Sequence, residues 1–289
     1  MKIDAFYQKA ISKTIGTSAA LLSSSMATGG MINNSVILHT DQGAYFLKWN
    51  NDANCDDLFK KESLGLQVLK QGPLKIPEVL GHGQIEDHYF LMLEHIAEGQ
   101  PDLSFWEIFG IKLAALHRIT SDQFGFETDN HIGKLTQYNS CKPDWADFFI
   151  NNRLLPQLEL GYRLGTIDST LIKSFEKLFP KLDRLFPREK PSLIHGDLWS
   201  GNFTCDTSGK PVIFDPATYF ANREIEIAFT KLFGGFNQKF YKSYHNCFSL
   251  ETGFNERVEL YNLYPLLVHV NLFGSSYLNG ILQTLKRFV

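Results

Sequence analysis

The sequence has no marked excess of charge and no long apolar run. Its 28 lysine and arginine residues stand against 31 aspartate and glutamate residues, and the pI is near 6.3. This balance favours neither a nucleic acid nor an anionic membrane as a partner. No apolar run is long enough to cross a membrane, and the N-terminal segment MKIDAFYQKAISKTIG lacks the apolar core of a secretory signal. We therefore expect a cytoplasmic protein without a membrane partner.

Metal-binding patterns of cysteine and histidine are also missing. The four cysteines form no C-x-x-C pair, and the nine histidines include no H-x-x-x-H spacing. Free thiols in a reducing compartment are thus expected, and a zinc site is not. The phosphate-binding patterns G-x-x-x-x-G-K-[ST] and G-x-G-x-x-G are absent too, so the chain is not a P-loop enzyme.

The first part of the chain predicts a small sheet accompanied by helices. With 44% hydrophobic residues in 289, the chain can bury a sizeable core. Residue periodicity predicts helices at 4–15 and 56–70 and strands at 35–40, 44–49, 76–81 and 88–94. Residues 96–103, with Gly99 and Pro101, are typical of a connector. We therefore divide the chain into residues 1–95 and 96–289.

From residue 105 onward the pattern is mainly helical. Apolar residues recur at helical spacing in seven ranges: 105–118, 144–160, 167–186, 222–234, 237–248, 255–271 and 275–288. Short apolar runs near residues 193 and 213 indicate a few strands among these helices. The predicted fold class is α+β, with a small strand-rich N-terminal part and a larger, mainly helical C-terminal part.

One short motif organises the expected chemistry. Asp197 follows His195 and Gly196 after an apolar lead-in, and Asn202 lies five residues further on. Asp215 ends a second apolar run. An aspartate that orients a hydroxyl, followed by an asparagine and an aspartate that hold Mg²⁺, is the layout of a phosphotransferase. His195 is expected to brace this loop, and Gly196 to permit a sharp turn. Alone, H-G-D is also common in ordinary turns, with each acid solvated or capping a helix.

A lysine and a glutamate earlier in the chain fit the same chemistry. Lys48 lies late in a predicted strand, and Glu62 lies on the apolar face of the helix that follows, among Leu58, Leu66 and Leu69. A buried carboxylate needs a partner, and Lys48 is the obvious candidate. In the functional interpretation Lys48 grips the phosphates of ATP and Glu62 holds its ammonium in place. The alternative is a surface lysine and an ordinary helix acid.

Two further segments are candidates for nucleotide binding. The small residues of 23–33, including Gly29 and Gly30, could cover phosphates with backbone N–H groups, or form a plain loop. Leu93, Glu94 and His95 lie where the two parts of the chain meet, where the backbone of a two-lobed nucleotide enzyme would bind the adenine edge. The alternative for them is an edge strand that runs into a linker.

Substrate contacts are expected close to the motif. Trp199 lies between Asp197 and Asn202, and its flat face suits the C–H face of a sugar, although it could equally be a packing residue. Arg223, Glu224 and Glu226 begin a helix soon after Asp215. They could contact substrate, but bracing of that helix is the expected role.

Several segments resemble the fructosamine/ketosamine 3-kinase family, which is part of the aminoglycoside-phosphotransferase-like and protein-kinase-like group. The tryptophan after HGDL and the DPA at 215–217 are the most specific matches. The matching segments, in chain order, are GGMIN (29–33), FLKWN (46–50), LAALHR (113–118), FGFETDNHIG (124–133), DWADFFINNRLLPQL (144–158), HGDLWSGN (195–202) and IFDPATYFANREIEIAFTKLFGGF (213–236).

The resemblance implies a bilobal protein-kinase-like fold and ATP-dependent phosphorylation of O3 on a ketosamine, free or protein-bound. The 3-phosphate products of this family release the amine, which implies deglycation. Asp197 becomes the proton acceptor, while Asn202 and Asp215 become the Mg²⁺ ligands. Some relatives have cysteine at the position of Met31, so redox control is not expected to carry over. Pro216 stiffens the segment that follows Asp215, and we expect no flipping switch there.

Other functions stay open at this point. The same chemistry on an aminoglycoside, choline or homoserine is the nearest alternative, and a non-catalytic nucleotide-binding scaffold is the rival class. The simultaneous presence of Lys48, Asp197, Asn202 and Asp215 argues against the scaffold. The preferred ketosamine (ribulosamine, erythrulosamine or fructosamine) and the oligomeric state are not determined by the sequence.

Overall fold

The chain folds into two compact units. The structure, a computed structural model, describes residues 3–27 and 33–289. Unit 1 consists of Met1–Phe105 and Gly201–Pro216, and unit 2 of Trp106–Ser200 and Ala217–Val289. One of the three crossings between units, after Ser200, therefore falls between Asp197 and Asn202, and another comes directly after Pro216. The division at residue 95 stays a prediction about functional lobes, because compactness alone does not assign nucleotide or substrate binding.

Unit 1 contains an antiparallel five-stranded sheet with the strand order β1-β2-β3-β5-β4. Its strands are β1 (Leu21–Met26), β2 (Asn34–Thr40), β3 (Gly43–Asn50), β4 (Val79–Ile85) and β5 (His88–Glu94). The alternation of side chains along β3 sends Leu47 to one face and Lys48 to the other. The predicted small sheet is thus confirmed.

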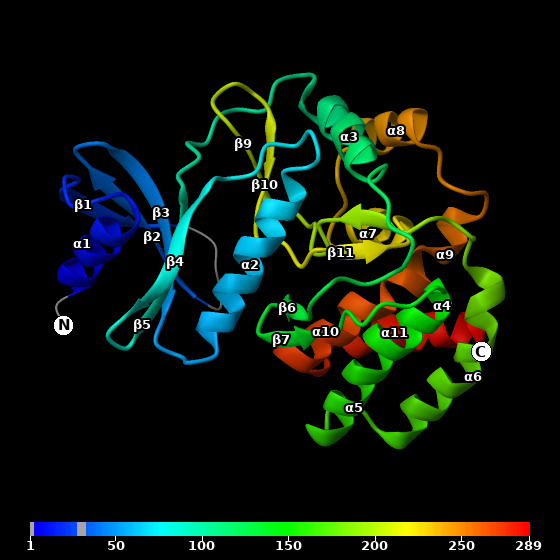
Figure 1. Ribbon diagram of the computed structural model, residues 1–289. Helices are drawn as coiled ribbons and strands as arrows, with labels where there is room; N and C mark the ends of the chain where they lie inside the picture. Colours follow the sequence, from blue (N-terminus) through cyan, green and yellow to red (C-terminus); the bar gives the residue numbers. More distant parts are fainter. Residues whose placement is uncertain (1–2, 28–32) are drawn as a thin grey trace. The chain divides into compact units, whose positions relative to one another are not determined.

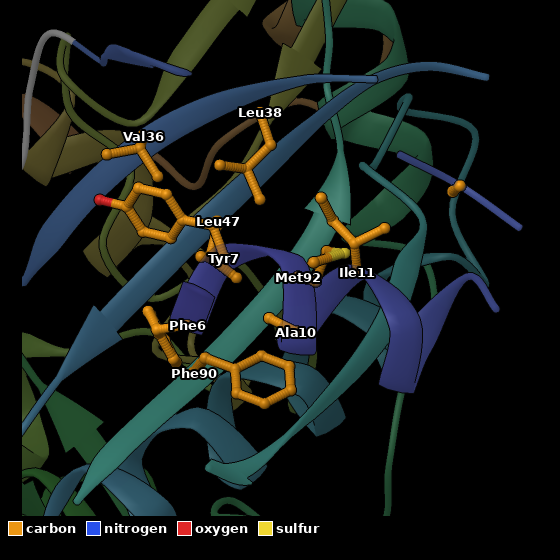
Figure 2. Close-up of a cluster of buried hydrophobic side chains, with 10 residues drawn as sticks. Phe6, Tyr7, Ala10, Ile11, Val36, Leu38, Leu47, Phe90 and Met92 are labelled. Atoms are coloured by element: carbon orange, nitrogen blue, oxygen red, sulfur yellow. The ribbon is translucent and has the colours of Figure 1, made fainter. Parts of the chain in front are cut away.

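Two helices cover this sheet on opposite faces (Figure 1). They are α1 (Ile3–Thr14) and α2 (Cys55–Leu69). Figure 2 shows the core beneath α1, where Phe6, Ala10 and Ile11 pack against Leu38 and Met92 of the strands. All five side chains are fully buried, and a buried aliphatic or aromatic side chain contributes about 1.5–3 kcal/mol. The other face is left for Lys48 and α2.

A hairpin from later in the chain completes unit 1. It consists of β9 (Phe203–Cys205) and β10 (Pro211–Ile213), which pair antiparallel. The N–H of Ile213 donates to the carbonyl of Lys75, and the N–H of Gly99 donates to the carbonyl of Cys205. The Ser208 hydroxyl and nearby backbone N–H groups lower the pKa of the Asp206 carboxyl in its turn to about 2. The hairpin is therefore firmly joined to the first hundred residues.

Unit 2 is mainly helical, as predicted. In unit 2, α10 packs against α5 and α11, and α7 packs against α9. Its helices are α3 (Phe105–Leu116), α4 (Trp145–Phe148), the π-helix η1 (Phe149–Leu154), α5 (Leu155–Arg163), α6 (Ser169–Leu185), α7 (Glu224–Phe229), α8 (Gln238–Cys247), α9 (Phe254–Tyr261), α10 (Leu263–Phe273), the 3₁₀ helix η2 (Ser275–Tyr277) and α11 (Leu278–Phe288).

Two short strand pairs lie within unit 2. They are β6 (Asn130–Ile132) with β7 (Leu135–Gln137), and β8 (Ser192–Ile194) with β11 (Tyr219–Ala221). The second pair brings the segment before Asp197 beside the segment that follows Pro216. Among the described residues, no helix combines the length and apolarity that a membrane span requires.

Several predicted boundaries were wrong. Residues 23–26, expected in a loop, belong to the edge strand β1, whose run of serines lacks the alternation that marks a strand. The strand expected at 76–81 begins only at Val79, after Pro77. The helices expected at 144–160 and 255–271 are each interrupted, at η1 and at Asn262. The spacing of apolar residues changes little where a helix changes its hydrogen-bonding pattern, so the sequence pattern cannot reveal these interruptions.

The helix expected at 222–234 is short, covering only 224–229.

Candidate active site

The buried face of unit 1 holds the predicted lysine–glutamate pair. The Nζ of Lys48 lies 2.7 Å from Oε1 of Glu62, and both side chains are about nine-tenths buried. Strand alternation points Lys48 toward α2, and the leucine face of α2 turns Glu62 toward the sheet. The pairing predicted from the two patterns is confirmed.

Asp215 joins this pair from the end of the hairpin. Its carboxylate is also in ion-pair contact with the Lys48 ammonium, and its side chain is 37% exposed. Asp215 has φ +57°, a conformation that non-glycine residues seldom adopt. Such strain persists only when the surroundings hold the residue in place. Asn202, which is buried, donates from Nδ2 to the carbonyl of Asp215 at 3.5 Å.

The charges of this cluster are unequal. Burial works to lower the pKa of the Lys48 ammonium, but the carboxylates of Asp215 and Glu62 outweigh it and raise that pKa. Burial also raises the pKa of the Glu62 carboxyl to about 7, against the opposing effect of Lys48. Two acids thus share one ammonium, so a further cation beside Asp215 is electrostatically favoured.

The oxygen atoms at this point suit magnesium. Asp215 and Asn202 offer a carboxylate and an amide oxygen, the hard ligands that Mg²⁺ prefers. Within residues 3–27 and 33–289, no three histidine, cysteine, aspartate or glutamate side chains gather as a metal cluster. Magnesium in phosphate-transfer sites is typically held by one or two carboxylates together with the phosphates themselves. The residues present therefore fit Mg²⁺.

The other nucleotide-binding candidates also belong to unit 1. Leu93 and Glu94 end β5, and His95 begins the connector, where burial lowers the pKa of its imidazole. The N–H of Glu94 already donates to the carbonyl of Glu78, so that N–H is not available to an adenine ring. Gly29 and Gly30 lie outside the described residues.

Asp197 lies in unit 2, on a loop that a buried glutamate holds by its backbone. The Glu226 carboxylate accepts hydrogen bonds from the N–H groups of Gly196 at 2.7 Å and His195 at 3.2 Å. Gly196 has φ +86°, and a Cβ there would lie 2.0 Å from the carbonyl oxygen of Ala217. Only glycine fits this turn, as predicted. The Asp197 N–H donates to His195 Nδ1, which agrees with a bracing role for His195.

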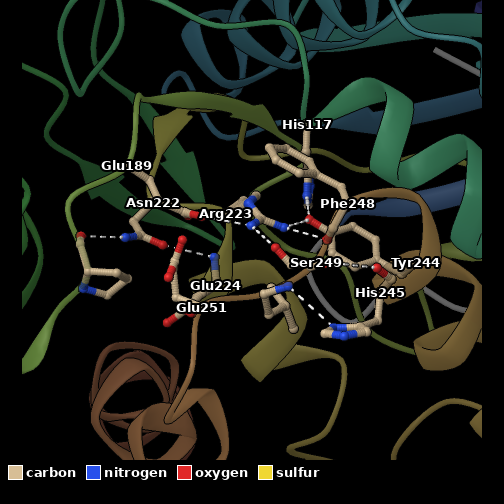
Figure 3. A network of polar contacts seen from close by, with 12 residues as sticks. His117, Glu189, Asn222, Arg223, Glu224, Tyr244, His245, Phe248, Ser249 and Glu251 are labelled. Atoms are coloured by element: carbon tan, nitrogen blue, oxygen red, sulfur yellow. Dashed lines mark hydrogen bonds and ion pairs between the residues drawn. The ribbon is translucent and has the colours of Figure 1, made fainter.

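Glu226 is itself anchored by a chain of buried polar groups, part of which is shown in Figure 3. Arg223 donates to the Tyr244 hydroxyl at 3.2 Å, and this hydroxyl lies 2.7 Å from His117 Nδ1. His117 Nε2 lies 2.8 Å from Glu226. One direction of donation satisfies every step, from Arg223 through Tyr244 and His117 to Glu226. Burial works to raise the pKa of Glu226, but the hydrogen bonds that it accepts from His117 and the Gly196 N–H help to lower it.

Arg223, Glu224 and Glu226 were expected to brace their helix, and each is bonded within unit 2, but Glu226 also holds the Asp197 loop. Arg257 forms a bidentate ion pair with Glu224, at 2.6 and 2.8 Å. The roles of His117 and Tyr244 were missed. They lie 109 and 18 residues from Glu226, and no local pattern marks them. The only sequence signal is the position of His117 in LAALHR.

Trp199 is placed where a ligand can reach it. It lies two residues after Asp197 in the same loop and is 36% exposed. A tryptophan that served only as packing would normally be covered more fully. Its exposure leaves part of the indole free for contact with another molecule.

The fold and these side chains together define the class of the protein. Protein-kinase-like phosphotransferases use a lysine on an antiparallel sheet and a glutamate on the helix that follows it. They also use an aspartate from a later part of the chain, whose carboxylate can bind a metal ion. The chain is accordingly a phosphotransferase of this class.

Comparison with known proteins identifies the family. The family model for fructosamine kinase matches residues 4–289, and the chain belongs to this family. A probable ketoamine kinase from Synechocystis sp. is 39% identical over 282 residues, covering 96% of this chain and 94% of its own. A crystal structure named as a putative fructosamine-3-kinase, from Thermobifida fusca, is 29% identical with a TM-score of 0.86, and the match covers 96% of both chains.

A more distant structure confirms the kinase-like fold. A thermostable mutant of an aminoglycoside phosphotransferase, in a ternary complex with AMP-PNP and hygromycin B, has a TM-score of 0.62. It is 17% identical, and the match covers 97% of this chain and 94% of that one. At this identity the likeness concerns the fold alone.

Proposed function

We propose that this protein is an ATP- and Mg²⁺-dependent kinase that phosphorylates the O3 hydroxyl of a ketosamine. The observation that carries the proposal is the Lys48 ammonium held between Glu62 and Asp215, on the unit that also contains Asn202. Family membership supports a ketosamine acceptor, as do the names ketoamine kinase and fructosamine-3-kinase of its relatives.

Unit 1 supplies the nucleotide-binding groups in this proposal. Lys48 binds the α- and β-phosphates, and Glu62 keeps its ammonium in place. The backbone near Leu93–His95 faces the adenine, and Gly29 and Gly30 cover the phosphates. Asn202 and Asp215 would hold Mg²⁺, which neutralises phosphate charge when bound.

Asp197 acts on the acceptor. It orients the O3 hydroxyl and takes up its proton as the new O–P bond forms and the bond to the leaving ADP breaks. Trp199 packs against the sugar beside it. Four residues separate Asp197 from Asn202 in the sequence, so the chain itself tethers the base to a metal ligand. The resulting 3-phosphate would release its amine, which gives deglycation of a free or protein-bound substrate.

Steady-state kinetics with ATP test this function. The acceptors are ribulose-, erythrulose- and fructose-amines, each made on a free lysine derivative and on a peptide, and the readout is ADP release. We expect turnover with at least one member of this series, and phosphorus NMR should place the phosphate on O3. A panel of aminoglycosides, choline and homoserine serves as the comparison.

Two outcomes would contradict the proposal. Efficient turnover of a panel alcohol without turnover of any ketosamine would assign the same chemistry to another acceptor. Nucleotide binding without turnover of any acceptor would indicate a scaffold.

A further inference from the structure

One buried arginine of unit 2 forms no ion pair with any described residue, unlike Arg223 and Arg257. Arg153, in η1, is fully buried, and none of the described residues offers it a carboxylate. Its guanidinium donates instead to the carbonyls of Tyr138 and Asn152 and to Asn139 Oδ1, the last at 2.7 Å. It also lies 3.9 Å from the centre of the Tyr219 ring. A buried cation is costly unless well compensated, so its position calls for a reason.

The contact with Asn139 sets the direction of a chain of amides. Because the guanidinium can only donate, it fixes Asn139 Oδ1 as the acceptor and turns Nδ2 away. That Nδ2 donates to Asn130 Oδ1 at 2.9 Å, which in turn leaves Asn130 Nδ2 as a donor. Asn130 Nδ2 donates to the carbonyl of Thr218 at 2.8 Å. If the Asn139 or Asn130 amide were turned over, an NH₂ group would face another donor and an amide oxygen would face another acceptor.

A parallel branch reaches the residue before Thr218. The Tyr264 hydroxyl donates to Gln137 Oε1 at 2.8 Å, which directs Gln137 Nε2 toward the carbonyls. This Nε2 donates to the Ala217 carbonyl at 3.0 Å and to Asn130 Oδ1 at 2.8 Å. Gln137 and Asn130 are both more than nine-tenths buried. The two branches therefore end on neighbouring carbonyls, with Gln137 Nε2 donating to Ala217 and Asn130 Nδ2 donating to Thr218.

The carbonyls of Ala217 and Thr218 lie two and three residues after Asp215, the proposed metal ligand. Ala217 follows Asp215 by two residues, and its N–H donates to the carbonyl of His195 in the Asp197 loop. Asp215 is in the strained left-handed conformation and depends on its neighbours to stay there. Pro216 separates Asp215 from Ala217, and its fixed φ limits how far one can move independently of the other.

We propose that Arg153, Asn139, Asn130 and Gln137, here called the Arg153 relay, are positioning residues for the metal ligand Asp215. The relay holds the two carbonyls after Pro216 in one arrangement, so that Asp215 is preorganised to bind its cation. The proposal rests on the metal-binding role of Asp215 in the proposed function. It also agrees with the expectation from Pro216 that this segment does not flip.

Binding of Mn²⁺ and ADP to the full chain tests the relay. In Gln137→Met the side chain keeps its length but cannot donate, so the competent arrangement of Asp215 becomes less populated. Electron paramagnetic resonance should then show a Kd for Mn²⁺, at saturating ADP, that is raised by about tenfold or more. The Kd for ADP measured in EDTA should be unchanged. Tyr264→Phe, which frees the Gln137 amide to turn, should raise the Mn²⁺ Kd by about threefold.

Asn271→Ala is the matched control. Asn271 donates to the main chain and side chain of Gln157, so its loss should lower thermal stability without a change in Mn²⁺ affinity. An unchanged Mn²⁺ Kd in folded Gln137→Met would overturn the relay and leave an ordinary buried polar cluster. If that variant does not fold, an unchanged Kd in Tyr264→Phe decides the same way. A wild-type protein that binds no Mn²⁺ with ADP would remove the proposed metal site itself.

Discussion

The two units each bury a glutamate beside a basic side chain, but they use it differently. In unit 1, Glu62 contacts the Lys48 ammonium, and Asp215 leaves part of the cluster exposed. In unit 2, Glu226 is covered completely and accepts backbone N–H groups of the Asp197 loop. The cluster in unit 1 keeps charged groups accessible to a ligand, whereas Glu226 in unit 2 uses its hydrogen bonds to hold a loop in place. Substitutions in unit 1 should therefore change chemistry, and those behind the loop should change stability.

The largest effect is expected for Asp197, the proposed base. Asp197→Ala should lower kcat by at least about 10³-fold, because it removes the group that orients and deprotonates the hydroxyl. Its unfolding free energy should stay close to that of the wild type. Asp122→Ala, an exposed acid of the same unit, serves as the control. Near-normal turnover by Asp197→Ala would refute the assigned role.

The glutamate behind the loop should instead dominate stability. Glu226→Gln places an amide NH₂ among groups that all donate, so the free energy of unfolding should fall by about 3–5 kcal/mol. Urea unfolding followed by circular dichroism measures this change. An unaltered unfolding midpoint would mean that the loop does not depend on Glu226.

Glu62→Gln should show the opposite pattern. The amide holds Lys48 less firmly, and loss of a charged hydrogen bond of about 1.5–3 kcal/mol lowers kcat/KM for ATP by about 10- to 100-fold. Stability should change little, since the burial cost of a carboxylate is removed as well. Kinetics and urea unfolding on the same preparation provide the comparison with Glu226→Gln. A variant that is unstable but fully active would reverse the contrast between the units.

Trp199 should affect only the acceptor. Trp199→Ala removes an aromatic surface, so KM for the ketosamine should rise by about three- to tenfold while KM for ATP is unchanged. Trp199→Phe should restore much of the loss. Equal KM values for the acceptor in wild type and Trp199→Ala would make this residue a packing residue.

A smaller effect is expected on acidification. The pKa of Glu226 is lowered in the folded protein, so its stabilising contribution is present above the ordinary glutamate pKa of about 4.3 and is lost as the pH falls through the folded value. The difference in unfolding free energy between wild type and Glu226→Gln should therefore stay constant from pH 7 down to about 5 and shrink as the pH is lowered below about 4.3. A difference that grew on acidification would mean that the pKa of Glu226 is raised rather than lowered in the folded protein.

The sequence predicted most of what depends on local pattern. The Lys48–Glu62 pair followed from a strand and a helix that are neighbours in the chain, each with a clear buried face. The glycine before Asp197 followed from the turn that the motif requires. The Arg153 relay and the His117–Glu226 contact could not be found in this way, because their members lie on separate elements. Nor could sequence order show that the hairpin around Asn202 and Asp215 belongs to the compact unit of the first hundred residues.

In the proposed function, Lys48, Asn202 and Asp215 hold one metal-bound triphosphate on which Asp197 acts. A crystal structure with AMP-PNP and Mn²⁺, the metal located by its anomalous signal, tests it most directly. We expect manganese bonded to the oxygens of Asn202 and Asp215, the Lys48 ammonium on the phosphates, and the Asp197 carboxylate facing the γ-phosphate. A nucleotide bound elsewhere, or manganese remote from Asp215, would contradict the account.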